Sequence, residues 1–330
     1  MARHHTAAYV MLRLRDFLNR RGNPFQLESL TGEQGLDRAL TDAEVASPGL
    51  ALAGYTGRFA PNRLHVFGET EITYLSSLPA EQRRRALENF FAFELPVVFV
   101  TKGQEVPPEL LELATARGVP LLRTRLKTAE FYRLIKPVVE DAFAPRSTLH
   151  GSLADVYGVG LLFVGRSGIG KSECVLDLVE RGHRLVADDV VQVVRRGNDV
   201  LIGRGHELAA HHMEIRGIGL IDIPALFGVR SVRQQKRIEV VVQLEDWENA
   251  KDADRTGLSR EETTILDVAV PRVVVPLNPG KNITVISEVV AMMHLLRYSG
   301  VDVAAAFNAR LIKRMKDQRG VREYLQEDYE

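Results

Sequence analysis

One short stretch combines glycines with a lysine and a hydroxyl side chain at a spacing that suits phosphate binding. It fits the pattern G-x-x-x-x-G-K-[ST] with the residues Gly165, Arg166, Ser167, Gly168, Ile169, Gly170, Lys171 and Ser172. Glycines let backbone N–H groups turn toward phosphate oxygens, and a helix that follows adds a partial positive charge. In such a loop Lys171 reaches the outer phosphates and Ser172 ligates Mg²⁺. The stretch therefore predicts binding of a nucleoside triphosphate, and the alternative is an ordinary glycine-rich turn.

The residues on both sides of this loop predict the elements that a phosphate-binding loop requires. The apolar run Gly160–Val164 comes before it and is typical of a buried strand, while Glu173–Val179 follows with helical spacing. This agreement favours the phosphate loop over a simple turn. Cys174 is the only cysteine, which excludes an intramolecular disulfide and fits a reducing compartment. Its position inside the helix predicts a small buried apolar side chain rather than a redox centre.

A second apolar strand, Arg184–Ala187, leads directly into Asp188 and Asp189. In a protein with a phosphate loop, acids at the end of a strand hold magnesium or a reacting group. Two adjacent carboxylates repel each other, so one of them is expected to have a raised pKa and to serve as a base. The alternative for this pair is a solvated turn.

A third group of candidate residues follows further along the chain. Glu214 is a hard oxygen donor of the kind that magnesium prefers. Gly217 and Gly219 permit close approach of the backbone to a ligand. Arg216 either reaches a phosphate or forms a structural salt bridge, and the sequence leaves both open.

Length and charge limit the classes of protein to consider. The 330 residues suggest two domains, and 43 acidic against 43 basic side chains give no reason to expect nucleic acid as a partner. The N-terminal apolar stretch Tyr9–Leu12 is short and is followed by Arg13 and Arg15, so no signal peptide or membrane segment is expected. We predict a soluble cytoplasmic protein.

The first half of the chain alternates strands and helices, which predicts a small open α/β sheet without visible chemistry. Its expected elements are a helix over Thr6–Arg20, strand or loop over Gly49–Gly54, a strand over Leu64–Phe67, a helix over Glu81–Phe91, a strand over Pro96–Val100, a helix from Pro107 and a strand over Val119–Leu122. A long helix is expected over Thr128–Phe143, and Pro145 prevents it from continuing. We therefore predict an N-terminal α/β domain over residues 1–140 and a catalytic P-loop domain over residues 141–330.

Taken in order, these residues resemble the HPr kinase/phosphorylase family. The resemblance is carried by the phosphate loop and by the segments His150-Gly151, Arg181–Asp189, Glu214–Gly219 and Asp254-Arg255-x-Gly257-Leu258. A phosphate loop alone is generic, whereas the ordered combination is specific. The match extends over most of the chain.

The resemblance implies an enzyme that uses ATP and Mg²⁺ to phosphorylate a serine of the phosphocarrier protein HPr. It also implies the reverse reaction, in which inorganic phosphate removes the phosphoryl group and pyrophosphate forms. The implied roles are phosphate binding by Lys171, magnesium binding by Ser172 and Glu214, proton transfer by Asp189, and assistance by His150 and Arg255. An N-terminal α/β domain, a C-terminal P-loop catalytic domain and a homohexamer are implied as well.

One turn departs from the family pattern, and two other functions compete with the resemblance. The family has Pro-x-Arg-Pro-Gly-Arg in a turn linked to dephosphorylation, where this chain has Asn278 and Lys281 in place of the arginines. We therefore predict weaker phosphorolysis than kinase activity. The alternatives are a P-loop kinase of a small metabolite and a nucleotide-binding regulatory module without transfer activity. Asp189 argues against the module, because such a protein needs no base.

Overall fold

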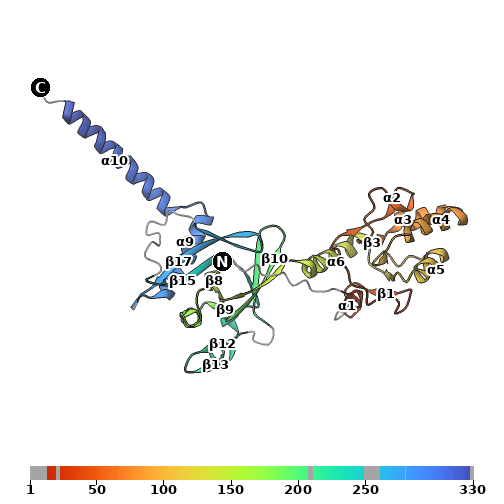
Figure 1. Cartoon of the computed structure of the whole chain (residues 1–330), viewed down its shortest axis with the longest axis horizontal. Coiled ribbons are helices and arrows are strands. Elements are labelled where there is room, and N and C mark those ends of the chain that lie inside the picture. The colour runs from red at the N-terminus through yellow and green to blue at the C-terminus, as the bar shows by residue number, and fades with distance from the viewer. Residues whose placement is uncertain (1–12, 20–22, 207–210, 249–260, 279, 328–330) are drawn as a thin grey trace. The chain divides into compact units, whose positions relative to one another are not determined.

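The computed structural model describes residues 13–19, 23–206, 211–248, 261–278 and 280–327, with the backbone alone described for 316–327. These residues divide into two compact units, and the division falls between Ala144 and Pro145 (Figure 1). Each unit contains both helices and strands, which confirms the predicted α/β class.

The N-terminal unit alternates helices with short strands. Its elements are α1 (Leu14–Leu18), β1 (Leu27–Ser29), β2 (Val45–Ala46), α2 (Gly49–Leu52), β3 (Leu64–Phe67), α3 (Glu69–Ser77), α4 (Ala80–Phe91), β4 (Val98–Val100), α5 (Pro108–Ala116), β5 (Leu121–Thr124) and α6 (Thr128–Phe143). The strands form one sheet in the order β1-β5-β4-β3-β2, in which only the β1–β5 pair is antiparallel.

This sheet is buried on both faces, as a mostly parallel sheet requires. Neighbouring residues of a strand point to opposite faces. Val66 accordingly packs in one apolar cluster with Phe131 of α6, while Phe67 packs in the other with Phe90 of α4. The continuous apolar runs that predicted these strands are therefore the consequence of helices on both sides.

The sequence prediction for Gly49–Gly54 is wrong in part. Gly49–Leu52 forms the short helix α2, which begins after Pro48. Its Ala51 and Leu52 are buried in the cluster that contains Phe90. Burial of these two apolar side chains against α4 thus decides the conformation of a segment whose own propensity is weak.

The C-terminal unit contains more strands. Its elements are β6 (Arg146–His150), β7 (Ser152–Val156), β8 (Val159–Val164), α7 (Lys171–Glu180), β9 (Arg184–Ala187), β10 (Val190–Arg196), β11 (Val200–Arg204), β12 (His212–Ile215), β13 (Gly219–Asp222), α8 (Ile223–Phe227), the 3₁₀ helix η2 (Val229–Ser231), β14 (Gln235–Arg237), β15 (Val240–Asp246), β16 (Glu262–Ile265), β17 (Val268–Leu277), α9 (Ile283–Tyr298) and α10 (Val303–Glu327). They build a six-stranded sheet, β16-β17-β15-β8-β7-β9, a four-stranded sheet, β14-β11-β10-β6, and the hairpin β12–β13.

Strand direction in the six-stranded sheet determines where its functional loops meet. Strands β8, β15 and β17 are parallel, and β7 is antiparallel to both β8 and β9. Strand β9 therefore runs in the same direction as β8. The segments that leave the carboxyl ends of β8, β9, β15 and β17 consequently all lie at one edge of this sheet.

Each face of the six-stranded sheet has its own apolar core. On one face, Leu161 and Phe163 of β8 pack with Val175 of α7 and Ala291 of α9. On the opposite face, Leu162 packs with residues of β10 and β11 from the four-stranded sheet. The strand that leads into the predicted phosphate loop is thus fixed from both sides.

The helices α9 and α10 follow β17. Helix α9 is capped by Asn282, whose side chain accepts a hydrogen bond from the Val285 N–H at 3.0 Å. Among the described helices, no single one has the length and apolar composition to cross a membrane. Helix α9 together with Val303–Met315, bent by 73°, meets those two criteria as a pair.

Gly160 in β8 gives a direct test of this packing. A Cβ atom at this position would lie 1.8 Å from the Arg237 carbonyl oxygen, so the backbones of β8 and β14 cannot keep their separation. We expect Gly160→Ala to destabilise the C-terminal unit by about 1–3 kcal/mol, the usual cost of overpacking. The matched control is Gly57→Ala, where the nearest atom is 3.7 Å away. An equal decrease in the unfolding temperature for Gly160→Ala and Gly57→Ala would contradict this packing.

Candidate active site

The predicted phosphate loop connects β8 to α7, which confirms the strand and helix expected around it. Gly168 and Gly170 have φ angles of +73° and +101°, which other residues rarely adopt. At Gly165 a Cβ would lie 2.7 Å from the Leu244 carbonyl oxygen of β15. The Lys171 side chain folds back over the loop, and its Nζ atom donates to the carbonyl oxygens of Gly165 at 3.2 Å and Arg166 at 3.1 Å. The loop therefore needs its glycines and carries its lysine at the helix N-terminus.

Ser172 is tied to the first of the two aspartates. Its Oγ atom donates to Asp188 Oδ1 at 3.0 Å, and Ser152 Oγ donates to the same oxygen. Burial raises the pKa of Asp188, and the two serine hydroxyls oppose this shift by stabilising the carboxylate. The acid pair that follows β9 is thus joined to the phosphate loop that follows β8, as the shared sheet edge requires.

Asp189 differs from Asp188 in exposure and in its contacts, and the raised pKa expected within the pair belongs to Asp188. The Asp189 side chain is exposed, and it makes no hydrogen bond or ion pair with another described residue. Its φ angle is +60°, a conformation that aspartate tolerates better than most residues. His150 lies beside it, because the Gly151 N–H donates to the Asp189 carbonyl at 3.0 Å and His150 pairs with Val190. The sheet thus brings His150 and Asp189 together.

The hairpin β12–β13 places Glu214 and Arg216 near the loop. Met213 and Ile215 point inward and pack in the same core as Ile169 of the loop. Glu214, between them, is exposed and has no hydrogen-bond or ion-pair partner among the described residues. The Arg216 guanidinium lies 3.3 Å from the position of a Cβ on Gly168. Of the two open interpretations for Arg216, this position favours contact with a phosphate.

The donor set of Ser172 and Glu214 fits a magnesium ion. Both offer hard oxygen atoms, and Mg²⁺ commonly takes one or two protein ligands with waters and substrate phosphates. Ser172 donates its hydroxyl hydrogen to Asp188, which leaves its oxygen lone pairs available to a cation. In the described part of the chain, no three His, Cys, Asp or Glu side chains cluster in a way that could hold a metal without other ligands.

Two contacts at the candidate site were not identified from the sequence. Asp246, at the carboxyl end of β15, forms a two-atom ion pair with Arg166 at 2.7 and 3.0 Å. Ser152 and its bond to Asp188 were missed too, since a lone serine at the start of a strand gives no signal. The pattern of an acid ending an apolar strand, which identified Asp188, would also have found Asp246. Arg255 lies outside the described residues.

The Cys174 side chain is buried in the core under α7, as predicted. Burial raises the pKa of its thiol to about 11, so the thiol is protonated at neutral pH. This agrees with a packing role.

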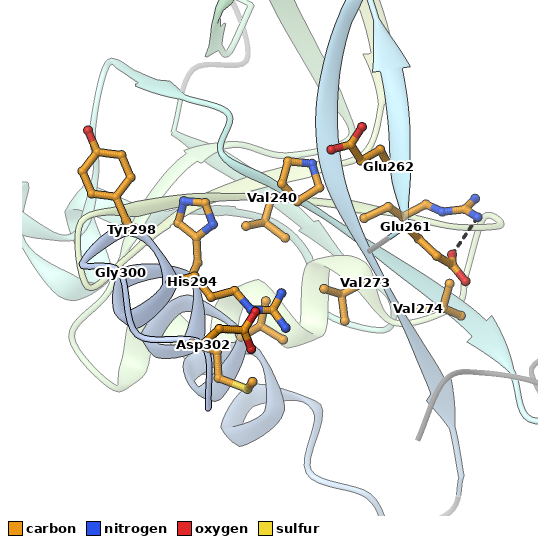
Figure 2. Close-up of a pocket in the computed structure, with 14 residues that line it drawn as sticks. Val240, Glu261, Glu262, Val273, Val274, His294, Tyr298, Gly300 and Asp302 are labelled. Carbon is orange, nitrogen blue, oxygen red and sulfur yellow. Dashed lines mark hydrogen bonds and ion pairs between the residues drawn. The ribbon is translucent and has the colours of Figure 1, made fainter. Parts of the chain in front are cut away.

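A cavity of about 590 Å³ lies elsewhere in the same unit (Figure 2). Val240, Val273 and Val290 contribute apolar walls, and an ion pair between Arg272 and Glu261 lies on one side. Val240 starts β15, so the cavity adjoins the end of this strand opposite to the phosphate loop. It shares no residue with the candidate active site, and the site's chemistry does not depend on it.

Comparison with known proteins assigns the family. The model of the HPr Serine kinase N terminus matches residues 13–138, and that of the HPr Serine kinase C-terminal domain matches residues 141–311. The HPr kinase/phosphorylase of Chloroherpeton thalassium is 47% identical over 301 residues, covering 89% of this chain and 88% of the relative. That of Geobacillus kaustophilus is 42% identical over 293 residues, covering 89% and 94%.

A solved structure of the Hpr(Ser) kinase/phosphatase from Coxiella burnetii is also similar, with 33% identity and a TM-score of 0.44. The match covers 49% of this chain and 98% of that one. Two family models that together span both units, and relatives above 40% identity over nearly nine tenths of the chain, lead to one assignment. The chain belongs to the HPr kinase/phosphorylase family.

Proposed function

We propose that this chain is a protein-serine kinase and phosphorylase that transfers the γ-phosphoryl group of ATP to a serine of HPr. In the reverse direction inorganic phosphate accepts the phosphoryl group from phosphoserine. The observation that carries the proposal is the single sheet edge that joins Lys171 and Ser172 of the loop to Asp188 and Asp189. Family membership supports HPr as the substrate, because the relatives named above are HPr kinase/phosphorylases.

In the forward reaction, Asp189 accepts the proton of the seryl hydroxyl as the seryl oxygen bonds to the γ-phosphorus. The bond from that phosphorus to the bridging oxygen breaks, and ADP leaves. Lys171 and the loop N–H groups neutralise charge on the phosphates. Arg216 lies against the loop at Gly168 and adds a second cation. Bound magnesium supplies further charge neutralisation, and Ser172 and Glu214 would hold it.

The reverse reaction uses the same groups. An oxygen of inorganic phosphate attacks the phosphorus of phosphoserine, and the seryl oxygen leaves with a proton from Asp189. The products are serine and pyrophosphate. Phosphorolysis differs from the exact reverse of the ATP reaction in its phosphoryl acceptor, but the seryl side is the same, so we infer that the carboxyl that accepts the seryl proton in one reaction returns it in the other.

Further features follow from family membership and belong to the same proposal. The catalytic P-loop domain spans residues 141–330 and the N-terminal domain residues 1–140, close to the division between the two compact units. We propose a cytoplasmic homohexamer, and a single buried thiol suits a reducing compartment. His150 and Arg255 assist the transfer, and the backbone pairing that places His150 beside Asp189 supports its part.

Transfer to HPr must be distinguished from transfer to a small molecule and from binding alone. Purified HPr and a panel of small hydroxyl compounds would each be incubated with the protein and magnesium-ATP, with ADP release as the readout. We expect ADP release that depends on HPr. Release with a small compound and none with HPr would favour the metabolite kinase, whereas ATP binding without any transfer would favour the regulatory module.

The turn after β17 is expected to limit phosphorolysis. It leaves the same sheet edge, since Leu277 pairs with Asp246 beside the phosphate loop. Asn278 carries no charge, and Lys281 donates from its Nζ to the Pro276 carbonyl at 3.2 Å. Phosphate carries negative charge and must approach a second phosphoryl group, so cations in this turn favour phosphorolysis in particular.

We expect Asn278→Arg to increase phosphate-driven dephosphorylation about tenfold to a hundredfold relative to the kinase rate, the value of one charge-assisted contact of about 1.5–3 kcal/mol. Pyrophosphate release across a phosphate titration measures one rate, and ATP-driven phosphorylation measures the other. Asn198→Arg, at an exposed position in the turn between β10 and β11, adds the same positive charge outside the candidate site and is the matched control. An unchanged ratio of the two rates would show that this turn does not set the balance.

A further inference from the structure

The Asp188 carboxylate contacts three structural elements at once. Its Oδ1 atom accepts hydrogen bonds from Ser172 of the loop and from Ser152 of β7. The backbone N–H of Asp189 donates to the same carboxyl group. The Asp188 side chain is therefore bonded both to the candidate magnesium ligand and to the turn of the candidate base.

The bond from Ser172 determines how its hydroxyl is oriented. A serine hydroxyl has one hydrogen and two lone pairs, and it rotates freely without a fixed acceptor. Because the hydrogen is directed to Asp188 Oδ1, the lone pairs face elsewhere and can bind a cation. The Asp188 carboxylate thus orients the Ser172 hydroxyl so that its lone pairs would be free to hold magnesium.

Ser152 is positioned to fix the orientation of the Asp188 carboxylate. It begins β7, between β8 with the phosphate loop and β9 with the aspartates, and it is fully buried. It pairs with Phe163, next to the end of β8. A buried hydroxyl needs a partner, and a hydrogen bond to a carboxylate is stronger than one to a neutral acceptor. Its partner is Asp188.

We propose that Ser152 and Asp188 form a positioning bridge, in which Ser152 fixes the Asp188 carboxylate and Asp188 fixes both the Ser172 hydroxyl and the turn at Asp189. The bridge rests on the proposed function and deepens it by adding two residues that act through others. It links the phosphate loop to the base across β7, the strand that separates them in the sheet.

Steady-state kinetics of Ser152→Ala test the bridge. We expect kcat to fall about tenfold to a hundredfold, as for loss of one hydrogen bond to a charged group, while KM for HPr stays unchanged. The matched control is Ser287→Ala, because Ser287 is equally buried but donates to the Ile283 carbonyl within α9. Ser152→Cys keeps the side-chain volume with a weak donor, so it must show the same fall if the alanine variant is unstable.

A double-mutant cycle shows whether Ser152 acts through Asp188. In an Asp188→Ala background, Ser152→Ala is expected to change kcat no further, because the acceptor is already gone. If Ser152→Ala and Asp188→Ala lower kcat by factors that multiply in the double variant, the bridge is refuted. A Ser152→Ala variant with the kcat of the wild type or of Ser287→Ala would overturn it as well.

Nucleotide binding separates a failed bridge from a failed function. A wild-type chain that transfers nothing to HPr would refute the proposed function alone. The bridge still predicts that Ser152→Ala weakens ATP binding in the presence of magnesium and leaves it unchanged in EDTA, measured by calorimetry. Equal affinities of wild type and variant under both conditions would refute the bridge, whatever the substrate.

Discussion

Asp189→Asn is expected to lower phosphoryl transfer to HPr by about two to four orders of magnitude, the usual contribution of a general base. Asparagine has nearly the same shape and tolerates the positive φ of +60° at this position, so the backbone should remain in place. It cannot accept the seryl proton. Nucleotide affinity should therefore stay at the wild-type level while kcat falls in both directions of the reaction.

The control for this substitution is Asp199→Asn in the turn between β10 and β11. Asp199 is an exposed aspartate of the same unit, and it belongs to none of the candidate site residues. Its replacement removes the same charge without affecting the proposed base. Near-normal turnover of Asp189→Asn would show that Asp189 is not the general base, since asparagine cannot accept the seryl proton.

Lys171→Ala is expected to impair nucleotide binding and transfer together. Lys171 is the cation of the loop that the motif assigns to the phosphates. Removal of one donor that stabilises transition-state charge costs about two to three orders of magnitude in rate. The Lys171 ammonium group donates to the Gly165 and Arg166 carbonyls, so it already lies over the loop rather than in solvent. Calorimetry with ATP and a transfer assay measure the two effects.

Lys136→Ala in α6 is the matched control, since this lysine forms only an exposed ion pair with Glu140. Both variants lose one positive charge. If Lys171→Ala kept the nucleotide affinity and rate of the control, the assignment of the loop as a phosphate site would be contradicted. A loss of affinity in the Lys171 variant alone would support it.

The sequence predicted the elements that carry strong local signals. The phosphate loop was identified together with β8 and α7 because glycine spacing, a buried strand and helical periodicity agree there. The long helix Thr128–Phe143 has the bounds predicted for it. Helix α2 was not predicted, because its formation depends on burial against α4.

Contacts between the candidate site residues were harder to predict from the sequence than the residues themselves. Ser152 and Asp188 are 36 positions apart, and their bond exists because β7 lies between β8 and β9. Strand order of this kind depends on long-range pairing, which no local pattern encodes. The family resemblance named Asp189 as the base, whereas the local pattern of two acids after a strand did not distinguish it from Asp188. The structure distinguishes the partly buried Asp188, bonded to two serines, from the exposed Asp189.

The central claim is that this chain phosphorylates HPr on serine, and mass spectrometry of HPr tests it most directly. HPr would be incubated with magnesium-ATP and either the wild-type protein or Asp189→Asn, then digested and its modified residue identified. The account predicts one added phosphoryl group on a serine with the wild type, and far less with the variant. Unmodified HPr after incubation with folded, ATP-binding wild-type protein would contradict it.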